Sequence, residues 1–96
     1  MRVLFTADAL RQFKKLPRVV RPFLKEAIRT HLIEADPAET NRNKFRLRRA
    51  SAYADYELRA GDWRIFYRVL GDDVTVTLLG EKRGHTLIVE GEELEL

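Results

Sequence analysis

Residues 53–69 read YADYELRAGDWRIFYRV and contain two runs in which apolar and polar side chains alternate. The alternation is interrupted once, at Gly61–Asp62, a dipeptide typical of the tight turn between two antiparallel strands. Period-two alternation of aromatic and β-branched residues predicts that each run is a strand with one buried face. The stretch therefore predicts a β-hairpin whose apolar face covers the core of the protein.

The second face of this hairpin is rich in charge. Its members are Asp55, Glu57, Arg59, Arg64 and Arg68, with Phe66 among them. This is more charge than an inert sheet face needs, so we look for function on this face first.

The chain before the hairpin predicts one strand and two helices. Residues 2–5 form a short apolar run, and Thr6 can cap a first amphipathic helix. That helix ends at Leu16, because the residue before a proline is pushed out of the α conformation. The second helix begins either at Pro17 or at Pro22, and a polar loop follows it.

A basic stretch lies between the second helix and the hairpin. Its cations are Arg42, Lys44, Arg46, Arg48 and Arg49. In an extended chain Lys44, Arg46 and Arg48 share one side. Two interpretations are equally open: a basic edge strand that resists wrong pairing, and a surface that contacts phosphate groups.

The chain after the hairpin predicts at least one more strand. Residues 71–73 form a turn into an alternating strand over residues 74–79, and residues 80–85 read as a glycine-bracketed polar loop. The tail either adds a strand or lies as a loose acidic end. The order predicts one α+β domain over residues 1–96, with a two-helix hairpin on one face of a mainly antiparallel, four- to five-stranded sheet. The opposite face of the sheet is expected to be open.

Composition limits the class of protein. The 96 residues are 45% hydrophobic and include no cysteine, which excludes a disulfide framework and a thiolate metal site. We see neither a signal peptide nor an apolar run of the roughly 20 residues that span a membrane. A soluble protein of the reducing cytoplasm is expected.

The net charge of +3 hides an asymmetry between the two halves of the chain. Residues 1–49 hold 13 Lys and Arg against 5 acidic residues, whereas residues 50–96 hold 5 against 10. A basic half can supply phosphate contacts to a nucleic acid, and it can equally be a set of solvated helix faces.

The central motif carries a family resemblance. The residues Leu58, Arg59, Gly61, Trp63, Arg64 and Tyr67 form the pattern LR-x-G-x-W-R-x-x-Y. With LPRVVRPFLKEAI at residues 16–28 and EKRGH at residues 81–85, this pattern resembles the RelE/ParE superfamily of type II toxin–antitoxin toxins. The resemblance extends over nearly the whole chain. It implies a cognate antitoxin partner that wraps around the toxin, and no cofactor.

The resemblance implies two alternative activities. RelE-like members cut mRNA in the ribosomal A site and so inhibit translation, whereas ParE-like members inhibit DNA gyrase without cutting nucleic acid. A third hypothesis is a toxin that has lost its activity and still binds an antitoxin.

Metal-independent RNA cleavage needs a general base, a general acid and cations that stabilise the phosphorane. By resemblance, Arg64 is the phosphate-stabilising arginine, and Arg83 or Lys82 is the second cation. His85 is the candidate general acid and Glu57 the candidate base. The residues expected to contact RNA are Lys44, Arg46, Arg48, Arg59, Arg68 and Lys82.

The chain also departs from the RelE-like pattern. Asp55 and Glu57 stand where RelE-like enzymes carry two lysines, and Val89 lies near the place of a C-terminal tyrosine. Glu57 is therefore either a base or, like Asp55, a cross-strand partner of Arg64 or Arg68. These departures favour the gyrase hypothesis.

Overall fold

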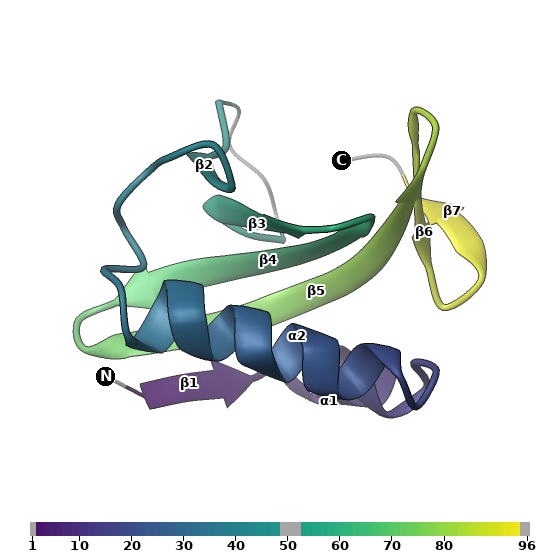
Figure 1. Ribbon diagram of the computed structural model, residues 1–96, viewed down its shortest axis with the longest axis horizontal. Coiled ribbons are helices and arrows are strands. Elements are labelled where there is room, and N and C mark those ends of the chain that lie inside the picture. Colours follow the sequence, from purple (N-terminus) through teal and green to yellow (C-terminus); the bar gives the residue numbers. More distant parts are fainter. Residues whose placement is uncertain (1, 49–52, 95–96) are drawn as a thin grey trace.

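The computed structural model describes residues 2–48 and 53–94, whose elements follow the predicted order (Figure 1). The elements are β1 (Arg2–Phe5), α1 (Ala7–Lys14), α2 (Val20–Ile28), the π-helix η1 (Arg29–Ile33), β2 (Lys44–Arg46), β3 (Tyr56–Ala60), β4 (Trp63–Leu70), β5 (Asp73–Arg83), β6 (Thr86–Val89) and β7 (Glu92–Leu94).

The strands form one sheet with the order β2-β3-β4-β5-β6-β7, and β1 pairs in parallel with β5. All other pairs are antiparallel. Both helices lie on one face of the sheet (Figure 1), which confirms the predicted α+β class. The described sheet has seven strands, more than predicted, because the tail forms both β6 and β7.

The hairpin predicted from residues 53–69 is present as β3 and β4. Ala60 pairs with Trp63, so that Gly61 and Asp62 form a two-residue loop. Gly61 has φ = 60°, a left-handed conformation that favours glycine at the first position of such a loop. Local sequence chemistry therefore fixes the turn and, with it, the register of the central hairpin.

The two α-helices begin in different ways: α1 has a side-chain cap, and α2 follows a turn. Thr6 Oγ1 accepts a hydrogen bond from Ala9 N at 3.1 Å and caps α1, as predicted. The second helix begins at Val20, after a turn in which Val20 N donates to Pro17 O at 3.0 Å. Pro22 lies in the first turn of α2, where a missing N–H leaves no helical hydrogen bond unmade. None of the helices in the described ranges is long and apolar enough to cross a membrane.

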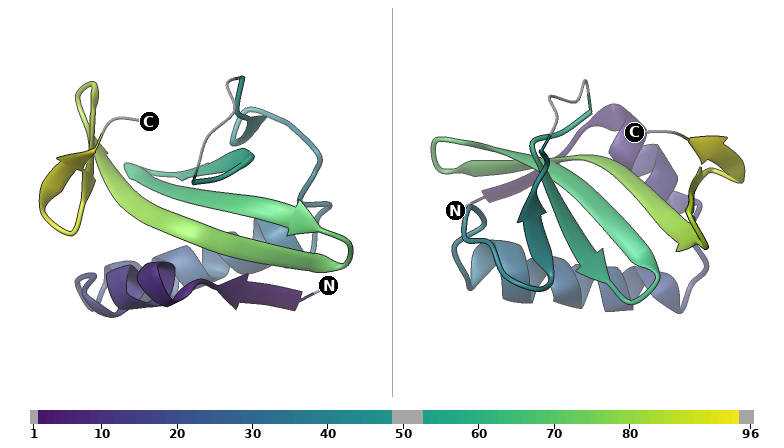
Figure 2. Two further views of the ribbon diagram at one scale, coloured as in Figure 1. Left: turned by 180° about the vertical axis from the view of Figure 1, so that it is seen from behind. Right: turned by 90° about the horizontal axis from the view of Figure 1, so that it is seen from above.

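The main core lies between the helices and the sheet. Its buried members are Ala9, Leu24, Ile28, Leu32, Tyr56, Leu58, Ala60, Ile65, Tyr67, Val74, Val76 and Leu79. A second apolar cluster, Ala54, Phe66, Leu78 and Leu87, lies on the opposite face. That face is therefore not fully open as expected, because β6 and β7 fold over part of it (Figure 2).

A β-bulge bends the long strand β5. Phe66 pairs with Leu78 while the next residue, Tyr67, pairs with Val76, which leaves Thr77 as the extra residue of β5. A bulge of this kind increases the local bend and shifts the alternation of side chains by one position. The sheet accordingly curves, and its face away from the helices is concave (Figure 1).

Candidate functional site

A cavity of about 610 Å³ lies on the concave face of the sheet. Its lining residues are Glu57, Arg64, Phe66, Lys82, His85, Thr86, Leu87, Glu93 and Leu94. The central strands β3 and β4 supply one wall, and the hairpin of β6 and β7 supplies the other. We call this cavity the concave pocket. It brings together Arg64, Lys82, His85 and Glu57, four of the residues predicted to act on RNA.

The bulge at Thr77 decides which cation enters the concave pocket. Before the bulge Val76 faces the helices, and after it Leu79 does. Lys82 consequently lies on the concave side, and Arg83 lies on the helix side. Arg83 Nε donates to Glu81 Oε1 at 2.8 Å there. Of the two cations that the sequence left as alternatives, the structure brings Lys82 into the pocket and keeps Arg83 apart from it.

The guanidinium of Arg64 is held by backbone carbonyls. Its Nη1 donates to Gly61 O at 2.8 Å and to Trp63 O at 2.9 Å. Its Nε is buried and has no hydrogen-bond partner among the described residues. Because Nε is covered by protein atoms, Nη2 is the nitrogen of this guanidinium that remains to donate to a ligand. Arg64 is therefore oriented in advance, with Nη2 available for a phosphate or carboxylate.

Glu57 lines the concave pocket and is held by a neighbour on its own strand. Arg59 Nε donates to Glu57 Oε2 at 2.8 Å, and the Arg59 guanidinium lies 4.4 Å from the centre of the Phe45 ring. Glu57 thus pairs along the strand, and not across it with Arg64 or Arg68. The carboxylate of Glu57 remains at the pocket with one strong partner.

His85 occupies the two-residue turn between β5 and β6. The predicted site loop over residues 80–85 is shorter than expected, because residues 80–83 continue β5. Gly84 has φ = 61° and provides the left-handed turn. His85 is exposed and lines the concave pocket, as does Lys82.

The predicted RNA contact of Lys44 is not met. Lys44 is fully buried, and its Nζ donates to His31 O at 2.9 Å and to Asp36 O at 2.8 Å. Burial lowers the pKa of the Lys44 ammonium below its ordinary value. The register that pairs Lys44 with Leu58 places its side chain on the helix-facing side of the sheet. Lys44 is thus held inside the protein by two backbone carbonyls, and its side chain is not exposed for contact with RNA.

The other predicted RNA contacts are spread over the surface. Arg46 Nη1 donates to Tyr56 Oη at 3.0 Å, and Arg48 is exposed just after β2. Arg59 lies beside Glu57, and Arg68 lies on β4 two residues beyond Phe66. None of these four lines the concave pocket. Arg49, the last cation of the basic stretch, falls outside the described residues.

Glu93 and Leu94 line the concave pocket and were not predicted from the sequence. They belong to β7, which pairs with β6 through Ile88–Glu93 and Leu87–Leu94. The alternation of Glu and Leu in residues 92–96 was the only signal, and it is too short to distinguish a strand from a loose tail.

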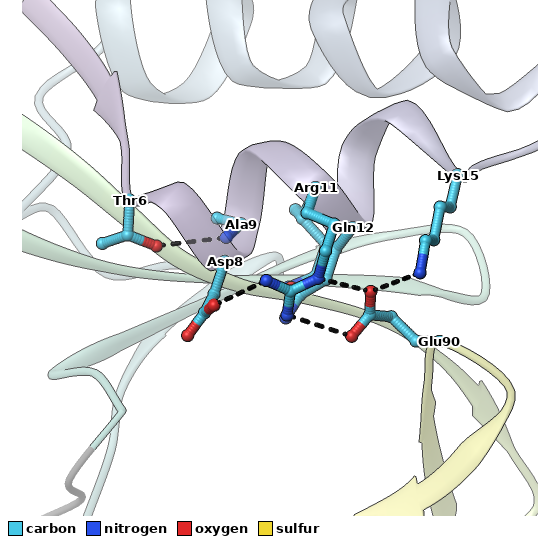
Figure 3. Close-up of polar contacts among 8 residues, drawn as sticks. Thr6, Asp8, Ala9, Arg11, Gln12, Lys15 and Glu90 are labelled. Atoms are coloured by element: carbon cyan, nitrogen blue, oxygen red, sulfur yellow. Dashed lines mark hydrogen bonds and ion pairs between the residues drawn. The ribbon is translucent and has the colours of Figure 1, made fainter.

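The turn between β6 and β7 is tied to α1 (Figure 3). Arg11 Nε donates to Glu90 Oε1 at 2.9 Å, and Lys15 Nζ lies 3.3 Å from the same oxygen. The hydrogen bond from Arg11 holds the pKa of the Glu90 carboxyl below its ordinary value. Glu90 has φ = 53°, the one left-handed non-glycine residue in the described chain. These contacts fix the hairpin that forms the second wall of the concave pocket.

A family model described as the ParE toxin of the type II toxin–antitoxin system parDE matches residues 3–83. The chain belongs to this family. None of the curated proteins matches the chain. Membership of the ParE toxin family confirms the predicted superfamily and implies an antitoxin partner. The matched residues run from β1 to the end of β5, so that β6 and β7 lie outside the family match.

Proposed function

We propose that this ParE-family toxin is a metal-independent endoribonuclease, acting on mRNA at the ribosome, and that the concave pocket is its active site. The strongest support for this function is that one cavity is lined by four of the predicted residues: Arg64, Lys82, His85 and Glu57. Cations, an imidazole and a carboxylate are the groups that RNA cleavage requires without a metal.

Each group has a role that fits its surroundings. Arg64 binds the scissile phosphate through Nη2, because its Nη1 is already bonded to backbone carbonyls and its Nε is buried. Lys82 adds a second positive charge as the phosphorane forms. Glu57 takes the proton of the ribose 2′-OH, and the 2′ oxygen then bonds to phosphorus. The bond to the 5′ oxygen breaks, and His85 gives that oxygen a proton, which leaves a 2′,3′-cyclic phosphate.

The neighbouring cations at the end of β5 provide a matched test. We expect Lys82→Ala to lower RNA cleavage by about 100-fold or more, as loss of one charged stabiliser of a transition state does. Arg83→Ala should leave cleavage within about twofold of the wild type, because Arg83 faces away from the pocket. The measurement is the mapping of mRNA ends after induced expression without antitoxin, with Arg64→Ala as the inactive reference. Equal losses in the two variants would contradict the assignment.

Gyrase inhibition is the second candidate. It is favoured by the match to the ParE toxin model and by Asp55 and Glu57 at the positions of two lysines in RelE-like enzymes. Growth arrest with DNA damage and intact mRNA would support this alternative. Expression of the chain alone without any growth arrest would instead support a partner of an antitoxin that has lost its toxicity.

A further inference from the structure

The guanidinium of Arg59 lies over an aromatic ring on the concave face of the sheet. Leu58 and Ala60 of β3 belong to the main core, so Arg59 between them points away from the helices. The central carbon of its guanidinium lies 4.4 Å from the centre of the Phe45 ring, which is a close cation–π contact. Phe45 is half-buried and supports the guanidinium from one side.

Two contacts fix the orientation of Arg59 and leave part of it open. Its Nε donates to Glu57 Oε2 at 2.8 Å, and its other contact is with the Phe45 ring. Nη1 and Nη2 donate to no atom of residues 2–48 and 53–94. The Arg59 side chain remains 45% exposed. Arg59 therefore offers a ligand a planar cation that is already oriented.

Arg83 has the same ion pair as Arg59 without the ring. Its Nε donates to Glu81 Oε1 at 2.8 Å, again two residues back along the strand. Arg83 lies on the helix side of the sheet, and it has no cation–π contact in the part of the chain that the structure describes. The supporting ring thus distinguishes Arg59, and Arg83 provides a matched control.

Arg59 lies next to Arg64, the phosphate-binding residue of the proposed function. The two arginines are directly paired across β3 and β4, and neighbouring strands lie about 4.8 Å apart. Like charges that face each other across strands destabilise a sheet. Arg64 forms no salt bridge with any residue of the described ranges. A phosphate at Arg64 would relieve this repulsion and bring a neighbouring nucleotide close to Arg59.

We propose that the Arg59 guanidinium, supported by Phe45, is a stacking platform for one nucleobase of the RNA whose phosphate binds Arg64. This inference rests on the proposed RNA-cleaving function. Proteins bind the bases of single-stranded RNA by stacking them on aromatic rings and on guanidinium planes. Every base has a flat π face, so the platform accepts all four bases. Lysine cannot replace Arg59 in this role, because an ammonium group has the charge without the plane.

The test uses RNA that cannot be cut, so that binding is measured apart from cleavage. The probes are a fluorescein-labelled 2′-O-methyl tetraadenylate and the four versions of it in which one nucleotide lacks its base. Their affinity is measured by fluorescence anisotropy at one fixed low salt concentration. The proteins are the wild type, Arg59→Lys and the control Arg83→Lys. Both substitutions keep the positive charge and remove a guanidinium plane.

We expect removal of the base at one position to lower the affinity of the wild type about tenfold, as the loss of one stacked base implies. In Arg59→Lys the loss at that position should be about twofold or less. The oligonucleotide without this base should bind Arg59→Lys and the wild type equally, which also shows that the variant is folded. Arg83→Lys should keep the tenfold loss.

Three results would overturn the platform: no position in the wild type at which the base matters, a loss that persists in Arg59→Lys, or the same reduction in Arg83→Lys. A wild type that binds none of the oligonucleotides overturns it as well. Failure of the proposed function appears separately, when mRNA ends are mapped after induced expression. Arg59-dependent stacking with intact mRNA refutes the nuclease alone, whereas cut mRNA without such stacking refutes the platform alone.

Discussion

Lys44 is a charged residue whose side chain is fully buried. Its ammonium donates hydrogen bonds to two backbone carbonyl oxygens. Those carbonyls, His31 O and Asp36 O, belong to the segment that leads from η1 into the loop before β2. Lys44 thereby joins the edge strand to the helices, a structural task for a residue in the most basic part of the sequence.

Replacing Lys44 with alanine should lower the free energy of unfolding by about 2–4 kcal/mol, because a cavity forms and two carbonyls lose a partner. Arg48→Ala, four residues along the chain and exposed, should change it by less than about 0.5 kcal/mol. Urea denaturation of both variants is the measurement. Similar stabilities for the two variants would show that Lys44 is not a buried anchor.

The candidate site was predictable at Arg64, Glu57 and His85, because each has the residue type and motif position that the chemistry needs. The choice of Lys82 over Arg83 and the presence of Glu93 at the pocket were not predictable. The choice between Lys82 and Arg83 depends on one unpaired residue in β5, and period-two patterns do not reveal a bulge. Glu93 enters the site only through the folding of the hairpin over the sheet, which is a tertiary event.

At the scale of elements, the β3–β4 hairpin and the helices were predictable from local signals. Turn glycine, capping threonine and strict alternation all lie within a few residues of the structure they specify. The C-terminal hairpin was not predictable in the same way. Its strands span four and three residues, and their stability depends on packing against β5 and on Glu90.

Gly80 is the position where packing of the hairpin can be tested. Gly80→Ala should lower the free energy of unfolding by about 1–3 kcal/mol, since its Cβ would overlap Leu87 and crowd Ile88 O. Leu87→Ala in the same chain should relieve the side-chain part of that overlap. A double-mutant cycle by urea denaturation should then show favourable coupling between the two substitutions. Strict additivity would mean that the two residues do not meet.

At the scale of the whole molecule, Glu90 joins the two ends of the chain by pairing with Arg11 and Lys15 (Figure 3). The pKa of Glu90 is lower in the folded state than in the unfolded state, where it is about 4.3. A lowered carboxyl pKa stabilises the fold at pH values above the unfolded pKa, and this stabilisation is lost as the pH falls through the folded pKa.

We therefore expect the melting temperature of the wild type to exceed that of Glu90→Gln at pH 7, and the difference to shrink steadily between about pH 5 and pH 3. Thermal unfolding followed by circular dichroism at both ends of this range is the measurement. Glu92→Gln is the control, because Glu92 is exposed and forms no salt bridge with any residue in the described ranges. A difference that does not depend on pH would exclude the ion pairs as its source.

The parallel pairing of β1 with β5 has a consequence for synthesis on the ribosome. Val3 must find Val74, and the main core needs side chains up to Leu79. A nascent chain that still lacks β5 cannot bury its helices, since non-local contacts form only after the intervening chain is available. A chain released before β5 is made therefore lacks the partner strand of β1 and the strand that carries Lys82 into the concave pocket.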